Sequence, residues 1–125
     1  MKLYTFDSAP NPARLKMFID YKGIAVDTQQ IDMGKAAQLD ASYTEVVPEA
    51  TLPALVLEDG TRLTEVIAIA HYLEAMHPNR PLLGTTPVER GLILNWNHRI
   101  FNTLFMACAA FNFRKFIRIL YFLCL

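Results

Sequence analysis

Leu52 and Pro53, near the middle of the chain, are of types that could bind an extended peptide through the backbone. They open the apolar run TLPALVL, which is typical of a buried strand. Proline has no N–H for a sheet ladder, so Pro53 indicates a strand start or an edge, where neighbouring backbone groups are unpaired. If the Leu52–Pro53 bond is cis, the N–H and C=O of Leu52 turn outward and could pair with a peptide as an added strand.

A second group of candidate binding residues follows at Glu65 and Val66, where a helix is expected to begin. Thr64 is a typical N-cap. The apolar residues after it have the spacing of one helix face: Val66, Ile69, Leu73 and Met76. A helix N-terminus holds carboxylates through its unpaired N–H groups and its positive dipole end, and Glu65 could pair with an adjacent ammonium. Together with the Leu52 backbone, this combination fits a zwitterionic γ-glutamyl peptide.

The elements that must position these residues are short and closely spaced. A strand is predicted over 2–6, in the centre of a sheet, and a helix over 12–22. Asn11 is a good N-cap, and Gly23 suits the left-handed position after the helix. One face of this helix is apolar and ends in a lysine that is expected to snorkel to solvent: Leu15, Phe18, Ile19 and Lys22.

The next elements are a weak strand pattern within 23–32, with Val26 and Ile31 inward, and a short helix near 36–40. A turn at Asp59-Gly60 then joins the Pro53 strand to a strand over 62–64.

Composition limits the class of protein. The 125-residue chain is 53% hydrophobic and has no net charge, with 7 basic and 11 acidic residues up to residue 84, then 5 basic and 1 acidic. No basic stripe could neutralise a phosphate backbone, so no nucleic-acid partner is expected. No segment reaches the roughly 20 uncharged apolar residues of a membrane span. The two cysteines, Cys108 and Cys124, lack metal or redox spacing and no secretory signal is recognised, so a cytoplasmic location is expected.

The motifs TLPAL, DGTRLTE and AIAHYLE, in this order, resemble the glutathione-binding half of the glutathione S-transferase family. The resemblance implies an α/β fold, with a thioredoxin-like βαβαββα domain over residues 1–80. It implies glutathione as a cosubstrate bound by Leu52, Pro53, Glu65 and Val66. Family members commonly have Ser in place of Val66, where the hydroxyl and the N–H both hold the γ-glutamyl carboxylate. Val66 keeps only the N–H, which weakens anchoring by about 0.5–1.5 kcal/mol, one neutral hydrogen bond.

In this family the loop before the first helix, and the start of that helix, hold the reacting thiol. Lowering a thiol pKa from about 8.5 to about 6.5 requires about 2.7 kcal/mol of stabilisation of the thiolate. A helix N-terminus supplies about 0.3–1 kcal/mol, up to about 2 when partly buried, so a donor aimed at the sulfur is also expected. The candidates are the Ser8 hydroxyl, the Asn11 amide and the backbone N–H groups of the helix start. Aligned on Arg14, the family's usual Ser, Thr or Cys falls on Ala9 or Pro10. Turn and cap roles are the alternative for Ser8 and Asn11.

The other polar candidates carry weaker signals. The resemblance places residues 33–48 over the glycine end of glutathione, where Lys35 or Gln38 could meet its carboxylate; solvated side chains are the alternative. The remaining candidates are expected at the surface or at helix ends rather than in a metal site: His71, His77 and His98.

The second half of the chain is predicted to be helical. Residues 81–86 are predicted to form a linker, and Thr86-Pro87-Val88-Glu89 has the pattern of a capping box. From there a helix is predicted to reach about residue 111, opening a partial all-helical domain over 87–125. Its apolar stripe fits a core or a subunit interface: Ile93, Trp96, Ile100, Leu104 and Ala107.

WNHRI and LFMACAAF resemble the first helix of the family's second domain. After residue 113 the resemblance stops, and we expect a truncated or frame-shifted product. A genuine short form whose apolar end favours association is the alternative.

Three functions remain open from the sequence. The first is a transferase, in which Asn11 or Ser8 steadies the glutathione thiolate while it adds to a small electrophile. The second is a non-catalytic interaction module that forms a homodimer through its third helix and the Pro87 helix. The third is an inactive fragment. A disulfide oxidoreductase ranks below these, because Ser8-Ala9-Pro10-Asn11 offers no cysteine.

Overall fold

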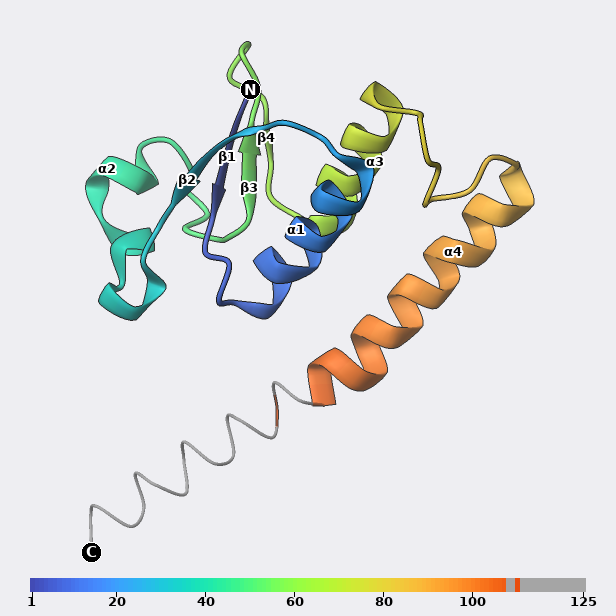
Figure 1. Ribbon diagram of the computed structural model, residues 1–125. Helices are drawn as coiled ribbons and strands as arrows, with labels where there is room; N and C mark the ends of the chain where they lie inside the picture. Colours follow the sequence, from blue (N-terminus) through green and yellow to red (C-terminus); the bar gives the residue numbers. More distant parts are fainter. Residues whose placement is uncertain (108–109, 111–125) are drawn as a thin grey trace, which may run out of the picture. The chain divides into compact units, whose positions relative to one another are not determined.

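The computed structural model describes residues 1–107 and residue 110, and the chain divides into two compact units, Met1–Pro81 and Leu82–Leu125. The first unit contains, in order, β1 (Lys2–Thr5), α1 (Pro10–Lys22), β2 (Asp27–Gln30), 3-10 turns at Met33–Lys35 and Ala37–Leu39, α2 (Ala41–Thr44), β3 (Ala54–Val56), β4 (Arg62–Leu63) and α3 (Val66–Met76) (Figure 1). The domain boundaries predicted from the sequence, with a linker over residues 81–86, remain a proposal.

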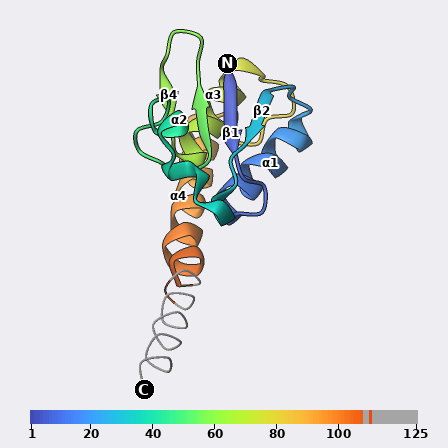
Figure 2. The same ribbon diagram turned by 90° about the vertical axis from the view of Figure 1, so that its left-hand side faces the viewer.

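The strands of the first unit form one mixed sheet in the order β2-β1-β3-β4. β1 runs parallel to β2 and antiparallel to β3, with Leu3 opposite both Thr28 and Leu55, and β4 is antiparallel to β3. As predicted, the first strand is central. Helices α1 and α3 lie on one side of the sheet and α2 on the other, as Figures 1 and 2 show. This βαβαββα order and sheet topology define a thioredoxin-like fold.

Both faces of the sheet carry an apolar core, because successive side chains of a strand point to opposite sides. On β3, Leu55 packs in one cluster and its neighbour Ala54 in the other. The cluster of the α1 and α3 face comprises Leu3, Leu15, Ile24, Leu55, Ile69 and Leu73. The cluster of the α2 face comprises Ile31, Tyr43, Val47 and Ala54. The first cluster holds α1 and α3 against the sheet, and the second holds α2 against its other face.

Both helix starts differ from the predictions. Helix α1 begins at Pro10 with Ala9 as N-cap, so Asn11 lies inside the first turn and is not the cap. Two prolines are tolerated here because the first N–H groups of a helix have no partner within it. Helix α3 has Glu65 as N-cap in place of Thr64, since Glu65 is still extended, with φ −99° and ψ 133°. The predicted end of α1 is confirmed: Gly23 is left-handed, with φ 67°.

Two side chains of the helices also differ from expectation. Lys22 does not snorkel: its side chain is fully buried and pairs with Glu74 of α3. Its ammonium also donates to the carbonyls of Asn79 at 2.9 Å and Arg80 at 3.3 Å, so all its donors can be satisfied without water. Met76, in the last turn of α3, was expected on the inner face, but it is 58% exposed.

The second unit begins with the predicted capping box. Thr86 Oγ1 accepts from the Glu89 N–H at 3.2 Å, and the Glu89 carboxylate accepts from the Thr86 N–H at 3.1 Å. Helix α4 runs over Pro87–Ile100 and continues as a π-helical turn over Phe101–Phe105. The predictions for the end of this helix, for Cys108 and Cys124 and for the tail lie outside the described residues.

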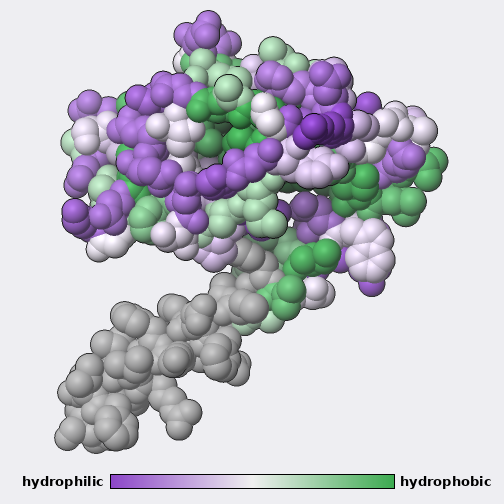
Figure 3. All heavy atoms as spheres, in the orientation of Figure 1, coloured by the Kyte–Doolittle hydropathy of each residue, from purple (hydrophilic) through white to green (hydrophobic). Residues whose placement is uncertain are grey.

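The apolar residues of α4 are largely at the surface, as Figure 3 shows along the described part of the helix. Trp96, Ile100 and Leu104 of the predicted stripe are 56%, 53% and 63% exposed, so they do not form a core within the described chain. Among the described residues, no helix is long and apolar enough to span a bilayer.

Glu89 is expected to keep its charge far into acid. Hydrogen bonds from the Thr85 hydroxyl and N–H, and from the Thr86 N–H, lower the pKa of Glu89 from its ordinary 4.5 to about 2. Because the folded pKa is the lower one, this stabilisation is complete above pH 4.5 and is lost as the pH falls through about 2. Carboxyl carbon NMR should show a midpoint near 2 for Glu89, and a higher one in Thr85→Ala. A wild-type midpoint near 4.5 would contradict the capping geometry.

Candidate functional site

A pocket of about 290 Å³ in the first unit brings together most of the candidate residues. The start of α1, the segment before α2, the loop before β3 and the start of α3 form its wall. Its lining residues are Asn11, Met33, Gln38, Ala50, Thr51, Leu52, Pro53, Thr64, Glu65 and Val66. Five of the six predicted site residues are therefore here, and the sixth, Ser8, is exposed and is not part of the lining.

The loop before β3 presents an open backbone to the pocket. The Leu52–Pro53 bond is cis, which meets the condition stated from the sequence, and Pro53 is buried. In the described part of the chain, neither the N–H nor the C=O of Leu52 has a hydrogen-bond partner. The sheet ladder begins only at Ala54, which lies opposite Tyr4. Leu52 can therefore offer one donor and one acceptor to an extended ligand.

The amide of Asn11 is oriented by Arg14 one turn further along α1. The Arg14 guanidinium donates to Asn11 Oδ1 at 3.3 Å. A guanidinium has no acceptor, so the amide atom that faces it must be the oxygen. The amide nitrogen of Asn11 is then directed elsewhere, and within the described residues it has no partner. Asn11 thus keeps two N–H groups for a ligand in the pocket that it lines.

The first turn of α3 forms the other side of the pocket. Glu65 and Val66 both line it, and the Glu65 side chain makes no capping bond to its own helix. The first intrahelical bond runs from the Ile69 N–H to the Glu65 carbonyl at 2.9 Å. The N–H groups before Ile69 therefore have no helical acceptor and can bind a carboxylate, with the Glu65 charge beside them.

The structure places Gln38 and Lys35, the two residues considered for binding a ligand carboxylate, in different surroundings. Gln38 lines the pocket, and its Oε1 atom is buried without a hydrogen-bond partner in the described chain. Lys35 is not part of the lining: its side chain is 84% exposed and lies 3.6 Å from the Asp32 carboxylate. Of the two, Gln38 is the one in position to meet a ligand.

Sequence reasoning missed four lining residues: Met33, Ala50, Thr51 and Thr64. The two threonines directly precede Leu52 and Glu65, so sequence adjacency could have indicated them. Ala50 has a left-handed backbone, with φ 52°. This conformation favours glycine, so an alanine in the sequence gives no indication of it. Met33 lies in a segment without periodicity.

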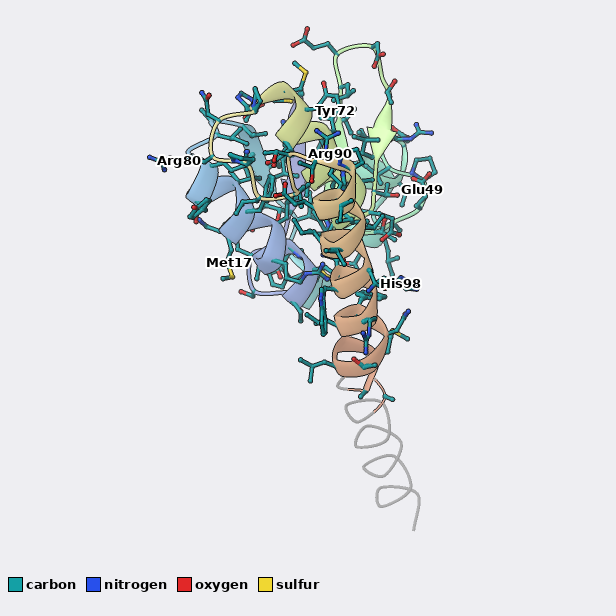
Figure 4. The ribbon with its side chains drawn as sticks, turned by 90° about the vertical axis from the view of Figure 1, so that its right-hand side faces the viewer. Met17, Glu49, Tyr72, Arg80, Arg90 and His98 are labelled. Atoms are coloured by element: carbon teal, nitrogen blue, oxygen red, sulfur yellow. The ribbon has the colours of Figure 1, made fainter. Side chains whose placement is uncertain are left out.

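Among the described residues, no three His, Cys, Asp or Glu side chains lie together in a geometry that could hold a metal ion. His71, His77 and His98 are all exposed. Figure 4 shows His98 on α4, well along the helix from Arg90, and Met17 of α1 pointing outward. The Nε2 atom of His98 lies 2.8 Å from the Asn102 amide nitrogen.

The fold and the pocket define a thioredoxin-like domain that offers free backbone groups beside a cis-proline and an open helix N-terminus. The family model described as "Glutathione S-transferase, N-terminal domain" matches residues 9–76, more than half of the sequence. The chain belongs to the glutathione S-transferase family.

Similar proteins extend the match beyond this domain. Glutathione S-transferase 2 of Saccharomyces cerevisiae is 31% identical over 101 residues, which cover 79% of this chain and 43% of that protein. A solved glutathione S-transferase domain-containing protein of Marinobacter aquaeolei is 31% identical with a TM-score of 0.80, covering 88% of this chain and 55% of that one. A glutathione transferase homologue from Sulfitobacter, solved with bound glutathione, is 26% identical with a TM-score of 0.76, covering 86% and 51%. The chain spans about half the length of these relatives.

Proposed function

We propose that this chain binds glutathione as a cosubstrate and presents its thiolate for addition to a small electrophile. The observation that carries the proposal is the convergence of an unpaired Leu52 backbone, an open α3 N-terminus and the Asn11 amide on one pocket. These groups match the cysteinyl backbone, the γ-glutamyl carboxylate and the sulfur of one tripeptide.

Each proposed contact follows from the chemistry of the pocket wall. The N–H and C=O of Leu52, beside Pro53, pair with the cysteinyl residue as a short added strand. The Val66 N–H holds the γ-glutamyl carboxylate, and Glu65 pairs with the neighbouring ammonium. The Gln38 side chain meets the glycyl end. Asn11 is the better candidate for the sulfur, because Ser8 is exposed and does not line the pocket.

The Sulfitobacter homologue with bound glutathione supports the ligand assignment, since it shares this fold at a TM-score of 0.76. The acceptor is proposed only as a class, an electrophilic small molecule, because the chain spans about half of the relatives' length. The cytoplasmic location stays a prediction, consistent with a free thiol cosubstrate that a reducing compartment maintains.

Glutathione binding should depend on Glu65 and Asn11 in different ways. Glu65→Gln is expected to raise the Kd for glutathione about tenfold, because the ammonium loses its countercharge. Asn11→Ala is expected to raise the pKa of the bound thiol toward its free value, because a donor to the charged sulfur is lost. Calorimetry gives the Kd, and the ultraviolet absorbance of the thiolate gives the titration.

Glu45→Gln is the matched control for charge, since Glu45 is exposed and does not line the pocket. It should leave the Kd unchanged. A folded wild type that fails to bind glutathione at millimolar concentration would overturn the proposed function. Binding with an unaltered thiol pKa would remove the transferase and leave a glutathione binder.

A non-catalytic interaction module is the second candidate, and one observation favours it. Several large apolar residues of α4 are more than 45% exposed: Val88, Leu92, Leu94, Trp96 and Ile100. Such a surface favours association, including a homodimer. Sedimentation of the wild type measures its association, and calorimetry with glutathione distinguishes the candidates, because a module of this kind associates but does not bind the ligand.

A further inference from the structure

Tyr43 lies behind the pocket wall and is bonded to it. It is on α2 and is only 2% exposed, and its ring packs edge-to-face on Tyr4 with centroids 5.7 Å apart. Its hydroxyl donates to the carbonyl of Thr51 at 2.6 Å. Thr51 and its neighbour Leu52 line the pocket, whereas Tyr43 is not part of the lining. The phenol therefore reaches the wall from the protein interior, on the side away from a ligand.

The wall needs such a support, because its own backbone is poorly anchored. Ala50 has φ 52°, a left-handed conformation that is unfavourable for alanine. Its N–H donates to the Val47 carbonyl at 3.0 Å. From there to β3, the bond from Tyr43 to Thr51 is the one hydrogen bond to the backbone that occurs among the described residues.

We infer that Tyr43 is a positioning residue for glutathione, which holds the Thr51–Leu52 peptide so that the Leu52 N–H and C=O face the ligand. The inference rests on the proposed function. A loop that is already fixed before binding loses little conformational entropy when the tripeptide pairs with it. This smaller entropy cost increases the affinity for glutathione. Nothing in the role requires contact between the phenol and the ligand.

The phenol is suited to act as a permanent donor. Burial raises the pKa of Tyr43 to about 12, with smaller contributions from Tyr4 and Glu49. The hydroxyl is therefore protonated across the range in which a glutathione thiolate is useful, and the wall is held independently of pH. Phe at this position would keep the ring packing on Tyr4 and remove only the donor.

The test compares two ligands in Tyr43→Phe. One is glutathione, and the other is an analogue in which a trans-alkene replaces the cysteinyl-glycine amide, so that it has no cysteinyl C=O to accept from the Leu52 N–H of the peptide that Tyr43 holds. Tyr43→Phe should raise the Kd for glutathione about two- to tenfold, the range of one hydrogen bond, and raise that for the analogue by a clearly smaller factor. Tyr4→Phe is the control, because it removes a phenol from the same cluster without touching Thr51.

The outcomes separate the inference from the proposed function. If Tyr43→Phe raises the Kd by the same factor for both ligands, or leaves the Kd for glutathione unchanged, the positioning role is overturned. Absence of glutathione binding by the wild type overturns the proposed function itself. Amide exchange in the unliganded protein is the second measurement, and it is followed at Ala50, whose N–H donates to the Val47 carbonyl in the same segment. In Tyr43→Phe, exchange that accelerates at Ala50 but not at Leu55 of β3 supports the inference. Equal acceleration at both sites overturns it, because the variant has then lost stability as a whole.

Discussion

Replacing Lys22 by methionine is expected to lower the free energy of unfolding of the first unit by about 3–5 kcal/mol. The substitution leaves the mostly buried Glu74 carboxylate, whose side chain is 15% exposed, without its lysine. It also removes the donor from the carbonyls of Asn79 and Arg80. Hydrogen exchange of the β1 and β3 amides measures the effect, because these strands belong to the first unit and report on its opening.

Lys16→Met is the matched control, since Lys16 pairs with Asp20 on the same helix but both side chains are at least half exposed. Such a pair contributes little to stability. The double variant Lys22→Met with Glu74→Leu should be more stable than Lys22→Met alone, because no carboxylate remains buried. Equal small effects of the Lys22 and Lys16 substitutions would show that the buried pair is not important for stability.

Leu55→Ala is expected to destabilise the first unit by about 2–5 kcal/mol. Leu55 has no exposed surface and lies in the cluster between the sheet and the helices α1 and α3. A cavity there loosens the two helices whose first turns line the pocket, so glutathione affinity should fall together with stability. Urea unfolding followed by circular dichroism, with calorimetry of glutathione binding, measures both.

Leu39→Ala provides the comparison, because Leu39 is 65% exposed and outside both clusters. It should change neither quantity appreciably. A stability loss at Leu55 with unchanged glutathione affinity would mean that the pocket does not depend on how α1 and α3 pack.

The order of elements could be predicted because apolar spacing and turn residues are local signals. The run before Asp59-Gly60, the capping box at Thr86 and the glycine that ends α1 all agree with the structure. The starts of α1 and α3 were predicted less accurately. Ala9 and Glu65 are N-caps without side-chain bonds, so no residue preference marked them.

The site was predictable where backbone chemistry determines it and less so where the tertiary fold does. Pro53 and the start of α3 carry their own sequence signals. The roles of Lys22 and Tyr43 depend on partners distant along the chain or in an aperiodic loop: Glu74 is 52 residues from Lys22, and Thr51 is eight from Tyr43. A lysine at the end of an apolar face gives the same pattern whether it reaches solvent or a buried carboxylate.

The pocket lining contains oxygen, nitrogen and one thioether but no thiol, since none of its ten residues is a cysteine. An oxidised or mixed disulfide of glutathione that enters the pocket therefore meets no partner in the lining for exchange. Occupancy should be reversible by dilution alone, because no covalent adduct forms between the pocket wall and glutathione that a reductant would have to release. Covalent labelling of this chain by glutathione disulfide would then have to occur elsewhere than on the pocket wall.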